Sequence, residues 1–310
     1  MHNRLNSWIN GYARETIGGY WGRLGVCLVS RSRGLPPTVV YVPSGKDTES
    51  AGWGEAVLKL EALSGIKRAQ MAFAMALDTD DVFLRTITVP EGLDERQLEQ
   101  VAIVEAVSNL PVPPEEICLD FIRGSSDGRD ETVGIAFCRR ERIDEILANA
   151  EEVNVPVHVI DRDVQAIHDA IENKALSENT DIKYPYGIVL TELSSRIVIC
   201  LGPTEFEVYP VRIPTDDIAE LGVSLLTQLK HCWMRCKMSR PIDSEVLEQV
   251  LVIGDVAPRF DWQSMNAETS SSKKIDHLLI DQFVEKDSAN DYAPDEIILI
   301  ALGMSGRCLS

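Results

Sequence analysis

One stretch of the sequence, Val82–Phe121, constrains the fold more strongly than any other. It contains in order a strand with alternating apolar residues, a helix, a proline-broken turn and a second strand. The expected positions of these elements are Val82–Val89, Gln97–Val107, Leu110–Pro114 and Ile117–Phe121. A strand at Thr132–Phe137 and a helix at Arg140–Val153 follow. The order strand–helix–strand–strand–helix predicts a compact subdomain over residues 82–154, inserted into a larger α/β chain.

The segments that flank this subdomain predict a first lobe, formed by residues 20–81 and 155–182. Its expected strands and helices are Leu24–Ser30, Thr38–Val42, Gly54–Leu63 (helix), Ala69–Ala76, Val157–Ile160 and Asp163–Leu176 (helix). The first two strands predict a hairpin, because Gly and Pro residues separate them.

Residues 1–19 are predicted to form a loosely ordered tail. Four apolar residues have helical spacing there, but glycines interrupt the pattern: Leu5, Trp8, Ile9 and Tyr12 against Gly11, Gly18 and Gly19. A short amphipathic helix that touches a membrane surface or a partner is the alternative.

A second lobe is predicted over residues 183–310, after the polar connection Ser177–Lys183. It opens with a meander of strands and continues with a long helix, a further strand, a mobile loop and a final helix after Pro294. The expected positions are Gly187–Glu192, Arg196–Leu201, Glu205–Val211, Asp216–Met238, Val250–Ile253 and, for the loop, Glu268–Lys274. Periodicity alone therefore predicts a mixed α/β protein with two lobes.

Composition narrows the class of partner and the compartment. The net charge of -19 over 310 residues disfavours nucleic-acid binding, because an acidic chain repels phosphate backbones. No apolar run approaches the ~20 residues that span a bilayer, and the N-terminus lacks an apolar signal segment, so we expect a cytoplasmic protein. The cysteines, an odd number of seven, fall mostly inside apolar strands or helices, which is typical of reduced thiols.

Motifs in and around the inserted subdomain resemble one family. They are Thr86–Pro90 with the helix and proline break behind it, Val133–Glu141, Val157–Asp161 followed by Gln165-Ala166, and the C-terminal Ile300–Met304. With these motifs the chain resembles the PilM family, actin-like cytoplasmic proteins of type IV pilus assembly with more divergent HofM and competence-protein members. The resemblance covers most of residues 24–303 and is strongest over 82–175. It implies a two-lobed actin-like (ribonuclease H-like) ATPase fold with a small inserted α+β subdomain.

The same resemblance predicts an eroded nucleotide site. ATP-binding members carry two phosphate-binding hairpins, in which glycine lets backbone amides approach phosphate and aspartate holds the metal, and a Gly-Gly adenosine turn. The first hairpin is expected at Leu24–Ser30, where Gly25 and Ser30 are further positions of the degenerate site. Within it, Cys27 stands in place of the aspartate and Val29 in place of the glycine. In the second hairpin Leu190 and Glu192 make the same replacements, and in the turn Asp255 follows Gly254. We therefore expect neither ATP nor Mg²⁺ to bind and no enzymatic activity; an active ATPase with unusual cleft residues is the alternative.

Other candidate sites favour structural roles. Cys232 and Cys236, beside His231, share the apolar stripe of a helix, so they are expected in a core and not at a metal. His168 is interpreted as a core or interface histidine. Asp161 and Asp163 flank a helix start and are interpreted as capping residues. No catalytic or metal-binding residue is expected.

The helix Glu95–Leu110 presents two apolar faces. One face, made of Ala102, Ile103, Ala106, Val107 and Leu110, is expected to pack on the small sheet. Val101 and Val104, beside Ser108, are expected to point elsewhere, either onto the first lobe or into a groove for a short apolar peptide. The resemblance implies that this peptide is the N-terminal tail of the inner-membrane protein PilN.

The functional hypothesis is a non-catalytic cytoplasmic scaffold of a type IV pilus or DNA-uptake machine. It would bind a PilN-like tail and other pilus assembly components, and would lie at the inner membrane through those partners. Homo-oligomers are left open. The further alternatives are an FtsA-like division protein and the cytoplasmic module of a type II secretion component.

Overall fold

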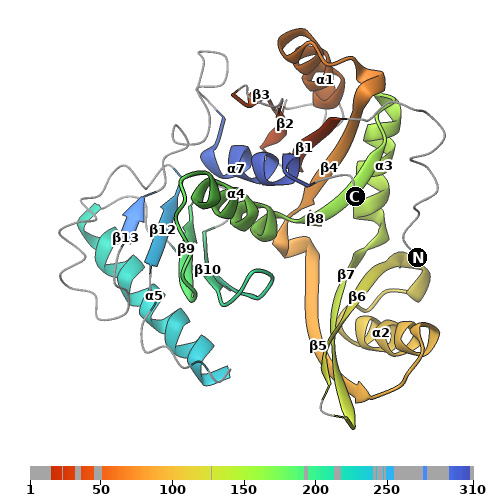
Figure 1. Ribbon diagram of the computed structural model, residues 1–310, viewed down its shortest axis with the longest axis vertical. Helices are drawn as coiled ribbons and strands as arrows, with labels where there is room; N and C mark the ends of the chain where they lie inside the picture. Colours follow the sequence, from red (N-terminus) through yellow and green to blue (C-terminus); the bar gives the residue numbers. More distant parts are fainter. Residues whose placement is uncertain are drawn as a thin grey trace.

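The computed structural model describes residues 15–22, 24–31, 36–44, 51–126, 128–191, 195–212, 218–239, 242, 247, 249–254, 275–277 and 293–307. These residues form two larger sheets and one small sheet, with helices on their faces (Figure 1). In the described part of the chain, no helix is both long enough and apolar enough to cross a bilayer.

The first sheet has the strand order β3-β2-β1-β4-β8. Its strands are β1 (Glu15–Gly22), β2 (Gly25–Ser30), β3 (Thr38–Pro43), β4 (Met71–Leu77) and β8 (Val157–Arg162). β1, β2 and β3 form an antiparallel meander, whereas β4 runs parallel to both β1 and β8. Every residue of β2 and of β4 is buried, as expected for strands that are covered on both faces.

The second sheet repeats this arrangement, with the order β11-β10-β9-β12-β13. Its strands are β9 (Tyr186–Leu190), β10 (Arg196–Cys200), β11 (Phe206–Pro210), β12 (Gln249–Ile253) and β13 (Ile275–His277). Again a meander of three strands comes first, and parallel strands follow on the other side of its first strand. The two lobes therefore correspond strand by strand, with β1 matching β9 and β4 matching β12.

Two helices lie between the sheets, α4 (Asp163–Ser177) and α7 (Asp295–Ser305) (Figure 1). They share one apolar core with residues from both sheets, including Tyr20 and Ala74 from the first and Ile188 from the second. On the outer faces, α1 (Ala51–Ser64) packs on the first sheet and α5 (Ile218–Ser239) on the second.

Two glycines allow this central layer to pack closely. A Cβ atom on Gly303 of α7 would lie 1.8 Å from the carbonyl oxygen of Ala166 in α4. A Cβ atom on Gly18 of β1 would lie 1.9 Å from the carbonyl oxygen of Ala301 in α7. Both distances are far below van der Waals contact, so only glycine permits these backbone approaches.

The inserted subdomain has the predicted order of elements. They are β5 (Val82–Pro90), α2 (Glu95–Asn109), β6 (Ile117–Ser126), β7 (Asp130–Arg139) and α3 (Arg140–Glu152), and the antiparallel sheet has the order β5-β7-β6. Asp94 caps α2: its carboxylate accepts a hydrogen bond from the backbone N–H of Gln97 at 2.8 Å. α2 packs on one face of the sheet, and α3 packs back onto the first lobe through Ile146 and Ala150.

The predicted tail at residues 1–19 is wrong for its last part. Residues 15–22 form β1, the central strand of the first sheet, and Ile17 and Tyr20 are fully buried. Gly18 and Gly19 interrupt a helical pattern in the sequence, but in a strand they provide room for α7 and for Met75. Residues 1–14 and the expected loop Glu268–Lys274 lie outside the described residues.

Candidate functional site

A cluster of polar side chains joins the two lobes where the strands of the first sheet end. We call it the interlobe cluster; it consists of Tyr20, Asp78, Thr79, Asp163 and Arg196. Tyr20 comes from β1, Asp78 and Thr79 follow β4, and Asp163 begins α4 directly after β8. The carboxyl ends of parallel strands lie at one edge of a sheet, so these residues are neighbours. Arg196 is the first residue of β10 and reaches the cluster from the second lobe.

The centre of the cluster is a buried ion pair. Nη2 of Arg196 lies 2.5 Å from Oδ2 of Asp163, and the side chains are 3% and 0% exposed. The other oxygen of Asp163, Oδ1, accepts hydrogen bonds from the backbone N–H of Val164 at 2.6 Å and from the hydroxyl of Thr79. Both oxygens of the Asp163 carboxylate are therefore occupied by groups of the protein itself.

Asp78 lies at the edge of the cluster and is less buried. The hydroxyl of Tyr20 donates a hydrogen bond to Oδ2 of Asp78 at 3.4 Å. Burial and the negative charge of Asp163 raise the pKa of Asp78 to about 6, although Tyr20 and Arg196 favour its charged form. Burial also raises the pKa of Tyr20 above its ordinary value, so this phenol stays protonated.

The charged groups at the centre of the cluster are already paired within the protein. Two carboxylates and one guanidinium gather there, and the guanidinium is already paired, so an incoming phosphate would meet an excess of negative charge. A hydrated metal ion would find neither oxygen of Asp163 free, since both have partners and the side chain is inaccessible.

The correspondence between the lobes corrects the position of the first hairpin. The second hairpin joins β9 to β10, so its counterpart joins β1 to β2 through the turn between Gly22 and Gly25. The expected hairpin, Leu24–Ser30, is instead strand β2 with the turn residue before it, because Glu15–Gly22 forms strand β1 and not a tail. The strand end that corresponds to Leu190 belongs to β1 and contributes Tyr20, which the sequence did not predict.

The residues expected in the first hairpin have structural positions. Cys27 and Ser30 are buried within β2, and burial raises the pKa of the Cys27 thiol well above its usual range. Gly25 has a φ of 140°, and a Cβ atom there would lie 2.2 Å from the carbonyl oxygen of Val42. Gly25 is thus required by the backbone of the turn.

In the second lobe the corresponding positions are apolar. Leu190 is fully buried at the end of β9 and pairs with Arg196 and Ile253 on the neighbouring strands. Gly254 follows β12 with a φ of 111°. Glu192 and Asp255, the other two residues expected at the eroded site, lie outside the described residues.

The capping roles expected for Asp161 and Asp163 are only partly confirmed. The N-cap position of α4 is Arg162, which makes no side-chain cap. Asp163 does accept a hydrogen bond from the backbone N–H of Val164 in the first turn, but its carboxylate also holds the interlobe ion pair. Asp161 lies 2.7 Å from Nη2 of Arg307, which follows α7. Both carboxylates therefore tie α4 and β8 to distant segments.

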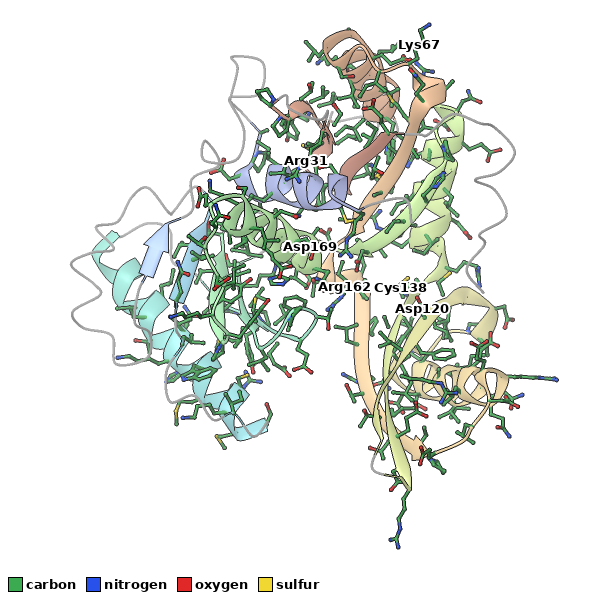
Figure 2. The ribbon with its side chains drawn as sticks, viewed as in Figure 1. Arg31, Lys67, Asp120, Cys138, Arg162 and Asp169 are labelled. Carbon is green, nitrogen blue, oxygen red and sulfur yellow. The ribbon has the colours of Figure 1, made fainter. Side chains whose placement is uncertain are left out.

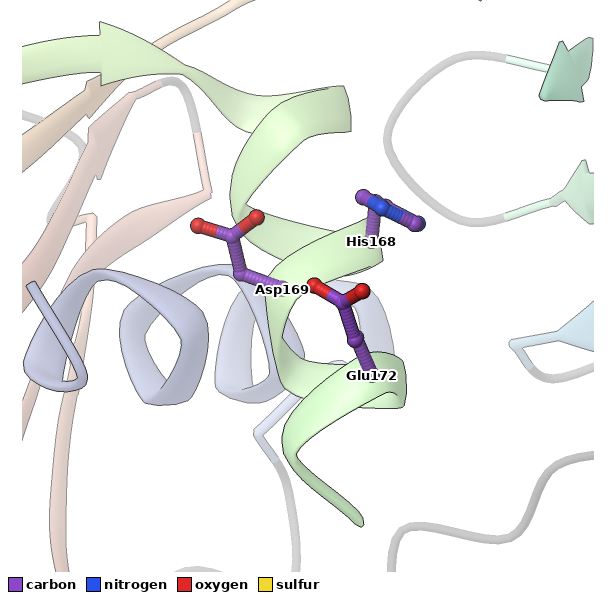
Figure 3. A group of neighbouring side chains, drawn as sticks. All are labelled: His168, Asp169 and Glu172. Carbon is purple, nitrogen blue, oxygen red and sulfur yellow. The ribbon is translucent and has the colours of Figure 1, made fainter. Parts of the chain in front are cut away.

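A second polar group lies on α4, where His168, Asp169 and Glu172 have ligand atoms within 4.8 Å of one another (Figure 3). Both ring nitrogens of His168 already contact tyrosine hydroxyls: Nδ1 lies 2.5 Å from that of Tyr186, and Nε2 lies 3.1 Å from that of Tyr184. Burial lowers the pKa of His168, which favours the neutral imidazole. His168 is therefore the core histidine that the sequence predicts. Cys232 and Cys236 are likewise buried in the core beneath α5.

Comparison with known proteins places this geometry in a family. The family model for the type IV pilus assembly protein PilM matches residues 54–195. The fold is similar to that of a PilM-PilN type IV pilus biogenesis complex, with a TM-score of 0.67, 18% identity and coverage of 94% of this chain and 98% of that chain. Residues 54–195 belong to the PilM family.

A second solved structure shares the fold at lower similarity. It is the cytoplasmic domain of EpsL, an inner membrane component of the type II secretion system of Vibrio cholerae, with a TM-score of 0.52 and 12% identity. The alignment covers 94% of this chain and 93% of that one. Together the PilM and EpsL structures confirm the expected two-lobed actin-like fold over most of the chain.

Within the PilM-family region, the residues expected to bind a partner are only partly on the surface. Val104 is 67% exposed, and the hydroxyl of Ser108 is exposed beside it and donates a hydrogen bond to the Val104 carbonyl at 2.8 Å. Val101 instead packs against the core between α2 and the small sheet, so it does not point away from that sheet as expected. The opposite face of the sheet exposes two more apolar residues, Ile122 at 74% and Leu84 at 38%.

Proposed function

We propose that this protein is a non-catalytic scaffold of a type IV pilus or DNA-uptake machine, which binds the N-terminal cytoplasmic tail of a PilN-like inner-membrane protein. The observation that carries the proposal is the PilM match over residues 54–195, because it covers the whole inserted subdomain. The solved PilM-PilN complex, which shares the fold, supports a partner of this kind. Binding such a tail would hold the scaffold at the inner membrane without a span of its own.

The interlobe cluster supports the non-catalytic part of the proposal. In the first lobe Asp163, one of the two carboxylates of the cluster, is already neutralised by Arg196. In place of a polar strand end, the second lobe offers the buried Leu190. Interactions within the protein would thus supply the stability that a nucleotide supplies in an active relative.

The inserted subdomain supports the peptide-binding part. Val104 on α2 and Ile122 on β6 are exposed apolar residues, and a short apolar peptide that docks on a helix or an open sheet face would contact side chains of this kind. They lie on opposite sides of the small sheet, because Ile122 pairs with Gly134 on the face that α2 does not cover. A single tail therefore uses one of these residues, and substitutions can identify which.

Nucleotide binding is tested first, with a fluorescent ATP analogue, Mg²⁺ and thermal unfolding of the full chain. A ligand at 100 times its Kd stabilises by ~2.7 kcal/mol, so binding would produce a clear increase in Tm. We expect neither a fluorescence change nor a shift. Saturable binding with a stability gain would establish the alternative, an active actin-like ATPase.

Partner binding is tested with a fluorescently labelled peptide that corresponds to the N-terminal cytoplasmic segment of the PilN-like protein from the same source. If α2 forms the groove, Val104→Asp is expected to weaken peptide binding at least tenfold. If the open sheet face forms it, Ile122→Asp is expected to weaken binding by that amount instead. Leu176→Asp is the matched control, since Leu176 is 66% exposed on α4, outside the subdomain. Equal affinity of all three variants and the wild type would exclude the inserted subdomain as the peptide site.

A further inference from the structure

Two cysteines face each other across neighbouring strands of the small sheet. Cys118 on β6 is the direct cross-strand partner of Cys138 on the antiparallel β7, and both are free thiols. Residues directly opposite in an antiparallel pair place their side chains on the same face of the sheet. The two Sγ atoms therefore extend from adjacent positions toward the same space.

The spacing of such a pair suits a disulfide. Directly opposite Cα atoms lie about 4.5–5.5 Å apart, and disulfides form at Cα separations of about 4.4–6.8 Å. The strands approach closely on this face, since a Cβ atom on Gly134 would lie 3.2 Å from Cγ2 of its partner Ile122. A bridge thus requires side-chain rotation and little movement of the backbone.

The pair lies where the inserted subdomain meets the first lobe. Figure 2 shows Cys138 at the end of the small sheet that adjoins the first lobe. Cys138 belongs to the core between α3 and that lobe, with Ile146 and Ala150, and Cys118 packs against the same core. Cys138 is 5% exposed and Cys118 is half-buried, so Cys118 is the thiol that solvent reaches first.

We propose that Cys118 and Cys138 form a redox-sensitive dithiol, which a low-molecular-weight disulfide such as oxidised glutathione converts to a cross-strand disulfide. The Cys118 thiolate attacks one sulfur of the small disulfide, so a mixed disulfide forms and one glutathione thiol leaves. Cys138 then loses its proton and attacks Sγ of Cys118, which releases the second glutathione thiol. The two cysteines are oxidised, and one disulfide is reduced to two thiols.

Closure would link β6 to β7 two residues before α3 begins, and so would fix the joint between subdomain and lobe. The environment of the two thiols makes their reaction slow and dependent on pH. The pKa of Cys138 is raised to about 11, mainly by burial. The nearby Cys118 and Asp81 also raise this pKa, whereas Arg140 lowers it. Burial also raises the pKa of Cys118, with Arg140 lowering it and Asp144 raising it. The rate of closure is therefore expected to rise steadily between pH 7 and pH 9.

The experiment exposes the full native chain to oxidised glutathione at both pH values, blocks the remaining thiols and maps the peptides by mass spectrometry. We expect a linked pair of peptides that contain Cys118 and Cys138, lighter by two hydrogen atoms than the separate peptides. Circular dichroism before and after oxidation ensures that the mapped protein is folded. Cys118 and Cys138 recovered as separate blocked thiols, or Cys118 carrying glutathione without closure, would overturn the proposal.

Variants and a second probe make the result specific. Cys118→Ser is expected to abolish the bridge, whereas the double variant Cys232→Ser/Cys236→Ser, which removes the helical pair in the α5 core, is expected to retain it. In that double variant, phenylarsine oxide should bind with one equivalent, because two neighbouring thiols displace its oxygen as water. Loss of this binding on adding Cys138→Ser would confirm the pair; unchanged binding would contradict it.

Discussion

The two lobes share a strand order but differ at the residues that end their strands. In the first lobe the ends of β1, β4 and β8 carry a phenol and two carboxylates, Tyr20, Asp78 and Asp163. In the second lobe the end of β9 is the buried Leu190, and β10 begins with Arg196. Among the described residues at these strand ends, the first lobe is therefore acidic, whereas the second lobe places an apolar side chain and a cation there.

This difference shows how a repeated architecture can be held together by complementary residues instead of identical ones. Arg196 neutralises Asp163, and the glycines of the central layer let α4 and α7 pack in contact. A buried charge pair adds little net stability compared with apolar side chains, but either charge left alone is costly. The lobes therefore depend on each other at this point, and substitutions can measure how strongly.

The largest effect is expected from Arg196→Leu. It leaves Asp163 buried without a counter-charge, which costs about 3–5 kcal/mol of unfolding free energy. Urea denaturation followed by circular dichroism measures this loss. The double variant Asp163→Leu/Arg196→Leu should recover most of it, because both charges are then absent. Equal destabilisation in the single and double variants would show that the two residues are not coupled.

A smaller loss is expected from Gly303→Ala, at the contact between the two central helices. The new Cβ atom would lie 1.8 Å from the Ala166 carbonyl oxygen, so the helices must separate. Overpacking of this kind costs about 1–3 kcal/mol. Gly54→Ala is the matched control, because it is also a helical glycine but has no atom within 4 Å of the new Cβ, and it should stabilise by about 0.5–1 kcal/mol. Equal shifts in both variants would contradict a close contact at Gly303.

The sequence predicted most of the strands and helices because their apolar patterns are local. It missed β1, since Gly18 and Gly19 resemble loop residues until α7, far away in the chain, is seen to pack on them. It missed the role of Asp163 for the same reason: the partner, Arg196, comes from the other lobe. A carboxylate before a helix is most often a cap, and only the tertiary fold distinguishes a cap from an ion pair.

Asp78→Asn tests the acidic side of the comparison. The pKa of Asp78 is about 6 in the folded protein against an ordinary 3.8, so the folded state holds this proton more tightly than the unfolded state. Stability of the wild type therefore falls as pH rises from 4 to 7. Asparagine removes that penalty and still accepts the hydrogen bond from Tyr20. At pH 7 the variant should be more stable by about 1–2 kcal/mol, allowing for partial exposure of the side chain.

The measurement for Asp78→Asn is urea denaturation at pH 4 and pH 7. The gain should be small at pH 4, where the wild-type carboxyl is already protonated. A gain in stability of the same size at both pH values would show that the titration of Asp78 is not its cause. A loss at pH 7 would mean that the charge of Asp78 stabilises the cluster.

The smallest effect is expected in the second lobe, from Thr191→Val. The Thr191 hydroxyl donates a hydrogen bond to the carbonyl oxygen of Ile253 at 3.0 Å, which links the end of β9 to the end of β12. Both groups are neutral, so the loss should be about 0.5–1.5 kcal/mol in urea denaturation. Thr79→Val, at the end of β4, removes a bond to the charged Asp163, for which about 1.5–3 kcal/mol is expected. A larger loss for Thr191→Val than for Thr79→Val would reverse the contrast, because the strand ends of the second lobe would then carry more polar stabilisation than the charged ends of the first.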